Sequence, residues 1–128
     1  MDRTEVLELI LDHYENPRNY GEIEDASISR QGGNPGCGDI ITVYLKFNGE
    51  RLEQMTYTGE GCTISQAAAS MLTEILPGYT FEQIENMDYH IIEEMLGEEL
   101  VKMRPKCSTL GLDTLKSATG QYHQQQMR

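Results

Sequence analysis

The chain has 128 residues and a mass of 14.5 kDa, a length that suits one compact domain over residues 1–128. No apolar run approaches the ~20 residues of a membrane-spanning helix, and the acidic Met1–Glu5 is unlike a secretory signal, which favours a cytoplasmic protein. A surplus of 21 acidic over 10 basic residues, a net charge of −11, opposes binding to nucleic acid or to an anionic membrane.

The first predicted element is an N-terminal helix. Asp2 and Glu5 have the spacing of a capping box, and apolar side chains follow at helical intervals. Because the residue before a proline avoids the helical region, we expect this helix to end before Pro17. Alternation around Ile28 then predicts a short edge strand over residues 27–31.

Two longer strands follow. Apolar and polar residues alternate from Ile41 to Phe47, which is the period of a strand. The pair Asn48-Gly49 is a hairpin signal, and the return strand is predicted over residues 51–58. These strands should pair as an antiparallel hairpin.

The register of this hairpin depends on its loop. A two-residue loop would place Gln54 opposite Val43, with a polar side chain on the apolar face. A three-residue loop instead sets Met55 beside Val43 and Tyr57 beside Ile41. Burial of the apolar face favours the longer loop, with a bulge at the turn glycine or its neighbour.

The remainder of the chain has helical patterns. Four helices are predicted: residues 63–76, opening on a capping-box pattern at Thr63, then one opening at Thr80, one from Asp88 to Gly97, and one starting near Cys107. Together with the N-terminal helix and the strands, they predict the α+β class. We expect a small antiparallel three-stranded sheet packed by about five helices.

The three cysteines, at positions 37, 62 and 107, are the most informative feature of the composition. An odd number argues against a disulfide framework. Their spacing matches no short ligand motif. The three cysteines can therefore be inert core residues, form a metal site, or carry sulfur and redox chemistry. Glycines beside Cys37 and Cys62 favour a shared site, because core cysteines rarely lie in such loops.

A carboxylate adds to this set. Asp39 follows Cys37 by two residues, so both side chains point the same way in an extended segment. Cys62 precedes a predicted helix and Cys107 precedes or opens another, where free N–H groups favour thiolate over thiol; Lys106 acts on Cys107 in the same sense. Three sulfurs and one oxygen suit Zn²⁺ or an iron–sulfur cluster.

Four segments carry a family resemblance: Asn-Pro-Arg-Asn at 16–19, Gly-Asn-Pro-Gly-Cys-Gly-Asp at 33–39, Gly-Glu-Gly-Cys-Thr-Ile-Ser at 59–65, and Lys-Cys-Ser-Thr-Leu at 106–110. In this order, along nearly the whole chain, they resemble the IscU/SufU/NifU-N iron–sulfur cluster assembly scaffolds. The resemblance implies a SufE/NifU-like α+β fold. It also implies a [2Fe-2S] cluster, or zinc, bound by Cys37, Cys62 and Cys107 with Asp39 as fourth ligand or nearby carboxylate.

The resemblance also implies partners. A pyridoxal-phosphate (PLP) cysteine desulfurase would deliver sulfur as a persulfide, acceptor apo-proteins would take the cluster, and the cluster-bound form could be a homodimer. Electrostatics favours Cys107 as the persulfide acceptor. On this interpretation the protein is a scaffold and carrier rather than an enzyme. Lys106 lies outside the coordination shell, either tuning the thiolate or simply solvated.

Two departures set this chain between branches of the family. Lys106 stands where the IscU branch usually has a histidine, and residues 100–106 replace its Leu-Pro-Pro-Val-Lys segment, which an Hsp70-type chaperone reads. Residues 60–65 and the Lys-Cys pair are more similar to SufU, the zinc-dependent sulfur-acceptor branch. However, the insertion that SufU usually carries before the third cysteine is missing.

Two alternatives therefore stay open. One is a zinc-dependent sulfurtransferase in which the same four residues, Cys37, Asp39, Cys62 and Cys107, hold zinc and a freed thiolate takes the persulfide sulfur. The other is a plain structural zinc domain, which Asp39 disfavours because closed structural sites prefer Cys and His ligands. His13, His90 and His123 follow no ligand spacing, and we expect them at the surface or at helix ends. The acids from Glu82 to Glu99 are expected to form a solvated helical face, able to meet a basic partner.

Overall fold

The computed structural model describes residues 2–34 and 38–127. Its elements, in chain order, are α1 (Arg3–Glu15), β1 (Ile28–Asn34), β2 (Asp39–Asn48), β3 (Arg51–Glu60), α2 (Thr63–Ile75), α3 (Phe81–Glu85), α4 (His90–Leu96), α5 (Glu98–Met103) and α6 (Pro105–Gln126). The strands form one antiparallel sheet in the order β1-β2-β3. The predicted α+β class is confirmed, with α5 as a helix more than expected.

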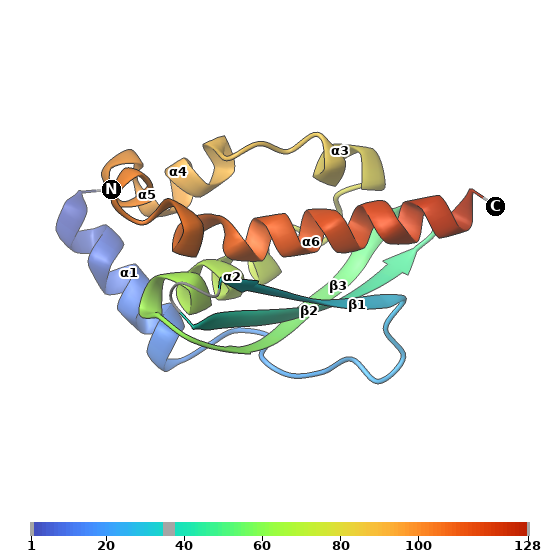
Figure 1. Ribbon diagram of the computed structural model, residues 1–128, viewed down its shortest axis with the longest axis horizontal. Helices are drawn as coiled ribbons and strands as arrows, with labels where there is room; N and C mark the ends of the chain where they lie inside the picture. Colours follow the sequence, from blue (N-terminus) through green and yellow to red (C-terminus); the bar gives the residue numbers. More distant parts are fainter. Residues whose placement is uncertain (1, 35–37, 128) are drawn as a thin grey trace.

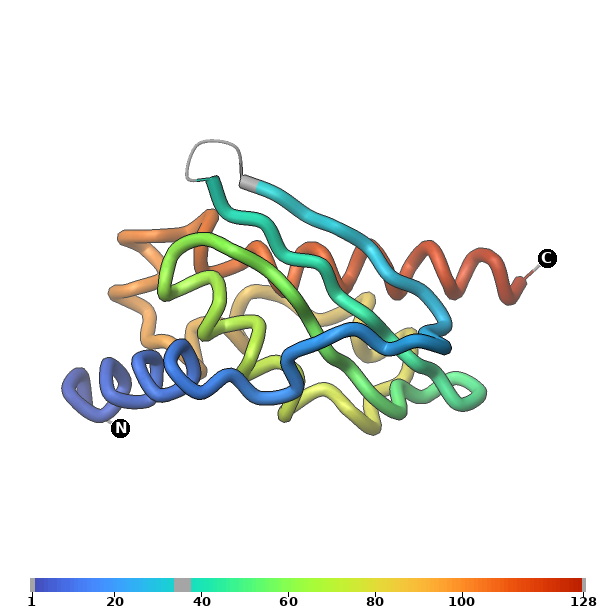
Figure 2. The backbone as a smooth tube through the Cα atoms, turned by 90° about the horizontal axis from the view of Figure 1, so that it is seen from below, coloured from blue at the N-terminus to red at the C-terminus, as the bar shows by residue number. Residues whose placement is uncertain are grey.

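Helices α2 and α6 cover one face of the sheet (Figure 1). Helix α6 runs over β1 and β2, while α2 packs on β2 and β3. The segment over residues 16–27 passes beneath the opposite face, where Lys46 pairs with Asp25 and the Tyr44 hydroxyl donates to Glu22 (Figure 2). None of the helices in the described ranges is long and apolar enough to cross a membrane.

Helix α1 has the predicted ends. The Asp2 carboxylate accepts the backbone N–H of Glu5 at 2.9 Å, so it caps the first turn, and the helix stops at Glu15, two residues before Pro17. After it, the chain forms a short bridge with β3, in which Tyr20 pairs with Tyr57. The end of α1 is thereby fixed beside the edge of the sheet.

The β2–β3 hairpin has a different register from the predicted one. Its loop is two residues, with Gly49 at φ +64°, and Val43 pairs with Tyr57 rather than Met55. The extra residue lies inside the strands, where the register shifts between Lys46 and Phe47. The predicted three-residue loop is therefore wrong, although the apolar residues of both strands do share the buried face.

The core lies between the sheet and the two long helices. The inward side chains of β2 are Ile41, Val43, Leu45 and Phe47, and they meet the small residues Ala67, Ala68 and Ala69 of α2. Small side chains allow close approach, and at Gly111 of α6 an added Cβ would lie 3.5 Å from Ala69. The three alanines therefore allow α2 to pack closely against α6 and the sheet.

Particular residues cap or open the helices that follow the sheet. Helix α3 has the predicted capping box between Thr80 and Gln83. The cap of α2 is Cys62, one residue earlier than the predicted Thr63, because the Cys62 side chain accepts the N–H of Ser65. Helix α6 begins at Pro105, so Cys107 lies in its first turn.

Candidate metal centre

Three predicted ligands meet at one end of the sheet. Asp39 is the first residue of β2, Cys62 is the N-cap of α2, and Cys107 lies in the first turn of α6. One ligand atom from each lies within 4.8 Å of the others. Figure 2 shows these starts of β2, α2 and α6 gathered at the same end of the molecule. Cys37 lies outside the described residues.

The Asp39 carboxylate is held by the start of α2. Asp39 is only 1% exposed, and its Oδ1 accepts the backbone N–H of Cys62 at 2.7 Å. The other oxygen, Oδ2, lies 3.6 Å from Cys62 Sγ. One oxygen therefore fixes the carboxylate, and the other faces the Cys62 sulfur.

Gly61 makes this contact possible. Its φ of +139° lies in the region that favours glycine, and a Cβ built on it would lie 2.1 Å from Asp39 Oδ1. Any larger residue would push the carboxylate away from the Cys62 N–H. The glycine before Cys62 is thus required by the packing of Asp39.

The Cys62 sulfur lies at a helix N-terminus. Its Sγ accepts the N–H of Ser65 at 3.5 Å, which occupies one of the free donors of the first turn of α2. The Ser65 hydroxyl, 3.7 Å from the same sulfur, donates to the Cys62 carbonyl at 3.1 Å and accepts from Gln66 Nε2 at 3.3 Å. The sulfur is therefore held at the N-terminus of α2 by the first turn of the helix.

Ser65 and Gln66 are supporting residues that sequence reasoning missed. Both are buried, and they form a second layer behind Cys62. The available signal was the position of Ser65, three residues after a cysteine that follows a strand, where a capping side chain meets its N3 partner.

The Cys107 side chain approaches the site from α6. The residue is 3% exposed, whereas its neighbour Lys106 is exposed. The structure therefore brings together Asp39, Cys62 and Cys107 as the sequence led us to expect.

This arrangement fits a thiophilic cation. Two thiolates and a carboxylate within 4.8 Å of one another would repel strongly in a largely buried site, and a bound cation removes that repulsion. Cysteine sulfur selects zinc or iron–sulfur clusters over Mg²⁺ and Ca²⁺, and an oxygen ligand is compatible with both. The donor set therefore fits the two groups that the sequence predicts.

The histidines are not part of this group. His90 and His123 pair with Glu94 and Glu85, and no histidine of the described ranges joins a cluster of metal-ligand side chains. His13 does lie in the last turn of α1, but it is buried, so the surface alternative is wrong for it.

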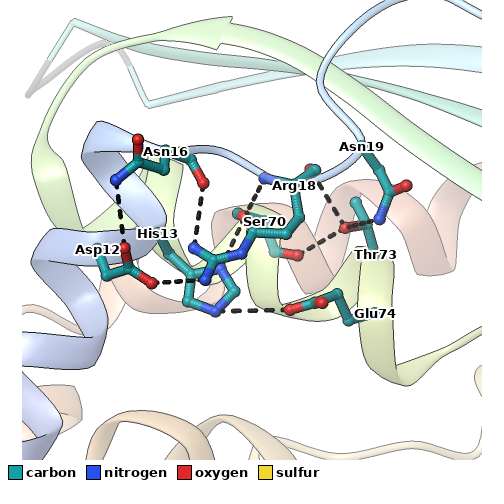
Figure 3. Close-up of polar contacts among 8 residues, drawn as sticks. All are labelled: Asp12, His13, Asn16, Arg18, Asn19, Ser70, Thr73 and Glu74. Atoms are coloured by element: carbon teal, nitrogen blue, oxygen red, sulfur yellow. Dashed lines mark hydrogen bonds and ion pairs between the residues drawn. The ribbon is translucent and has the colours of Figure 1, made fainter.

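A separate polar cluster surrounds His13 (Figure 3). Its Nδ1 lies 2.7 Å from Ser70 Oγ, and the backbone N–H of Arg18 donates to the same hydroxyl oxygen at 2.9 Å. Nε2 lies 3.6 Å from Glu74 Oε1. Burial lowers the pKa of His13, with a further contribution from Arg18, while Glu74 and Asp12 oppose the shift.

A helix-covered antiparallel sheet with two thiols and a carboxylate gathered at one end is the arrangement of a small domain with a candidate cysteine-based metal site. Comparison with known proteins identifies the family of this domain. The model of the NifU-like N terminal domain matches residues 6–128, and the chain therefore belongs to that family.

Its relatives include two functional types. An iron-sulfur cluster assembly scaffold protein IscU of Archaeoglobus fulgidus is 39% identical over 113 residues, which is 88% of this chain and 73% of the relative. A zinc-dependent sulfurtransferase SufU of Bacillus subtilis is 41% identical over 92 residues, 72% of this chain and 62% of the relative. A crystal structure of a SUF-system scaffold protein of Fervidobacterium islandicum superposes with a TM-score of 0.73 at 30% identity, covering 88% of this chain and 94% of that one.

Proposed function

We propose that this chain is a scaffold on which a [2Fe-2S] cluster is assembled and from which it passes to acceptor proteins. The convergence of Asp39, Cys62 and Cys107 carries the proposal, because these are the residue types that bind such a cluster. Family membership and the scaffold relatives support it. In this role the chain acts as one domain over residues 1–128, in the cytoplasm, as a carrier rather than a catalyst.

Cys37 completes the proposed ligand set. It is two residues from Asp39 in the sequence, and two residues of chain span at most about 7 Å. Three thiolates with Asp39 as the fourth ligand would leave one corner of the cluster held by oxygen. Oxygen binds iron–sulfur clusters less firmly than thiolate does, which suits a cargo that must leave.

Sulfur would come from a PLP-dependent cysteine desulfurase. The terminal sulfur of the donor's persulfide bonds to Cys107 Sγ, its bond to the donor cysteine breaks, and that cysteine leaves as a thiolate with the electron pair. Because Cys62 is more exposed than Cys107, we propose that the incoming sulfur passes Cys62 on its way. Each transferred sulfur must then gain two electrons from a reductant to become sulfide, the form found in the cluster. A cluster-bound homodimer is part of the same proposal.

A zinc-dependent sulfurtransferase is the second candidate. The SufU relative, 41% identical over 72% of this chain, favours it, and Cys37, Asp39, Cys62 and Cys107 suit zinc equally well. Bound zinc would keep the cysteines deprotonated. In this case the chain accepts persulfide sulfur but builds no cluster.

Anaerobic purification from iron-replete cells separates the two. We expect a brown protein with equal iron and acid-labile sulfide, and with charge-transfer absorption in the visible range. A colourless protein with one zinc per chain, which stimulates a desulfurase but takes up no cluster on reconstitution, would establish the sulfurtransferase instead. An Asp39→Ala variant then tests for a purely structural site: a carrier or transferase changes its transfer rate, whereas a structural zinc domain mainly loses stability.

A further inference from the structure

A hollow of about 460 Å³ opens beside the candidate metal centre. Its walls come from the end of α1, the loop that follows, and the end of β3. The residues that matter for its chemistry are Tyr14, Pro17, Tyr20, Glu60, Gly61 and Gln66.

The hollow and the metal centre share their wall. Gly61 lines the hollow on one side and abuts the Asp39 carboxylate on the other. Gln66 also lines it, and its amide donates to Ser65 Oγ, 3.7 Å from the Cys62 sulfur. A group seated in the hollow would therefore lie next to the residues that position Asp39 and Cys62.

Aromatic rings form the apolar part of the hollow. Tyr14 and Tyr20 are 44% and 52% exposed, so their rings are accessible. The Tyr20 ring contacts the buried Tyr57 ring edge-to-face at 5.1 Å, and its hydroxyl lies 3.3 Å from the Gly59 carbonyl and 3.4 Å from the Gly59 N–H. These contacts fix Tyr20 before anything binds.

Glu60 is the charged residue of the lining. It is exposed, and it forms no ion pair with any other residue in the ranges 2–34 and 38–127. Aromatic faces attract cations, and an adjacent carboxylate reinforces that attraction. The lining thus has the chemistry of a site for a guanidinium or ammonium group.

We propose that this hollow binds an arginine or lysine side chain of the cysteine desulfurase, next to the segment that delivers the persulfide. This assignment rests on the proposed function. A persulfide is carried on a single cysteine, so partner residues near that cysteine must come to lie beside the receiving sulfurs, where the hollow opens. The net charge of −11 would steer a basic partner surface towards the chain.

The first test uses a peptide probe. ¹⁵N-labelled protein is titrated with acetyl-Gly-Arg-Gly-amide, and with the same peptide containing citrulline, which has the shape of arginine without its charge. We expect saturable shifts of the Tyr20, Gly61 and Cys62 amides in the millimolar range, at least ten times weaker with citrulline. Equal shifts with both peptides, or shifts spread over the acidic surface of α4 and α5, would overturn the proposal.

The second test assigns the partner. Binding of a purified bacterial PLP-dependent cysteine desulfurase is measured for the wild type, Tyr20→Leu, Glu60→Gln and the control Glu53→Gln, which removes an exposed carboxylate of β3 outside the hollow. We expect Kd to rise about five- to tenfold for the first two variants and to stay unchanged for the control. Equal binding by all four proteins overturns the inference while leaving the proposed function intact.

Two other results of these experiments lead to different conclusions. If the desulfurase binds every variant equally but cluster transfer to an apo-ferredoxin slows in Glu60→Gln, the hollow serves the acceptor, and the assignment to the donor is wrong. If the wild type itself does not bind the desulfurase, the proposed function fails, and the donor assignment fails with it, even where the arginine peptide binds.

Discussion

Helix α2 carries two polar clusters of opposite character. In its C-terminal half, Ser70 and Glu74 contact His13 and Arg18. Hydrogen-bond donors in this cluster face acceptors, as is normal for polar groups inside a protein. At its N-terminus, Cys62 meets Asp39 and Cys107. Once the thiols are ionised, these are three acceptors, and they repel one another unless a cation binds. The comparison distinguishes a cluster that stabilises the fold from one that is built to bind.

The largest expected effect comes from removing a sulfur of the binding cluster. In Cys62→Ala, zinc affinity should fall roughly 100- to 1000-fold, because each thiolate of the proposed site would contribute a share of the about 10–16 kcal/mol with which cysteine-based sites bind zinc. Competition with a chromophoric chelator measures the loss. An affinity within threefold of the wild type would exclude Cys62 as a ligand.

The matched control acts on the other cluster. Ser70→Ala lies on the same helix but contacts His13 and Arg18, so it should leave zinc affinity within about twofold. A large loss of affinity in both variants would mean that the two clusters are coupled through α2, and the contrast between them would not hold.

A glycine substitution tests how rigidly the binding cluster is built. Gly61→Ala combines an unfavourable φ of +139° with a Cβ 2.1 Å from Asp39 Oδ1, and we expect a loss of about 3 kcal/mol in the free energy of unfolding. Gly78→Ala is the control, since it has φ +100° but nothing within 4 Å of the added Cβ. Urea unfolding of both variants separates backbone strain from the clash, and equal losses would contradict the close packing of Gly61 on Asp39.

Local chemistry explains what the sequence could predict. The ends of α1, the capping box of α3 and the position of Cys62 between a strand and a helix are set by residues within a few positions of one another. The fold class followed from these elements in order. The site residues came from glycine-flanked cysteines and from a family resemblance, not from their spacing.

Long-range packing explains what the sequence could not predict. The hairpin register depends on a bulge in β3 opposite Lys46 and Phe47, inside the strands, where the turn residues give no signal of it. Helix α5 has only six residues and none is fully buried, so Leu100 and Val101, which pack against the core, are too few to show a helical period. The partner of His13 is Ser70, 57 positions away, and only the folded chain brings them together.

Breaking the stabilising cluster should cost less than the glycine substitution. Ser70→Ala leaves the buried His13 Nδ1 and the partly buried Arg18 N–H without the hydroxyl that they share, and we expect a loss of about 2 kcal/mol. Chemical denaturation measures it, with the exposed Ser117→Ala of α6 as a control that should change stability by less than about 0.5 kcal/mol. A loss as small as that of the control would show that water replaces the hydroxyl.

The smallest effect is a dependence of stability on pH. Because the folded-state pKa of His13 lies below its ordinary value of 6.5, the unfolded chain takes up a proton that the folded chain resists. This contribution is therefore fully present above pH 6.5 and is lost as the pH falls from there through the folded-state pKa, by at most about 1.4 kcal/mol per pH unit. Urea unfolding between pH 8 and 5 should show a flatter profile in His13→Gln than in the wild type. His90→Gln, at an exposed position beside Glu94, should keep the wild-type dependence of unfolding free energy on pH. If it flattens this dependence as much as His13→Gln does, protonation of His13 is not the cause.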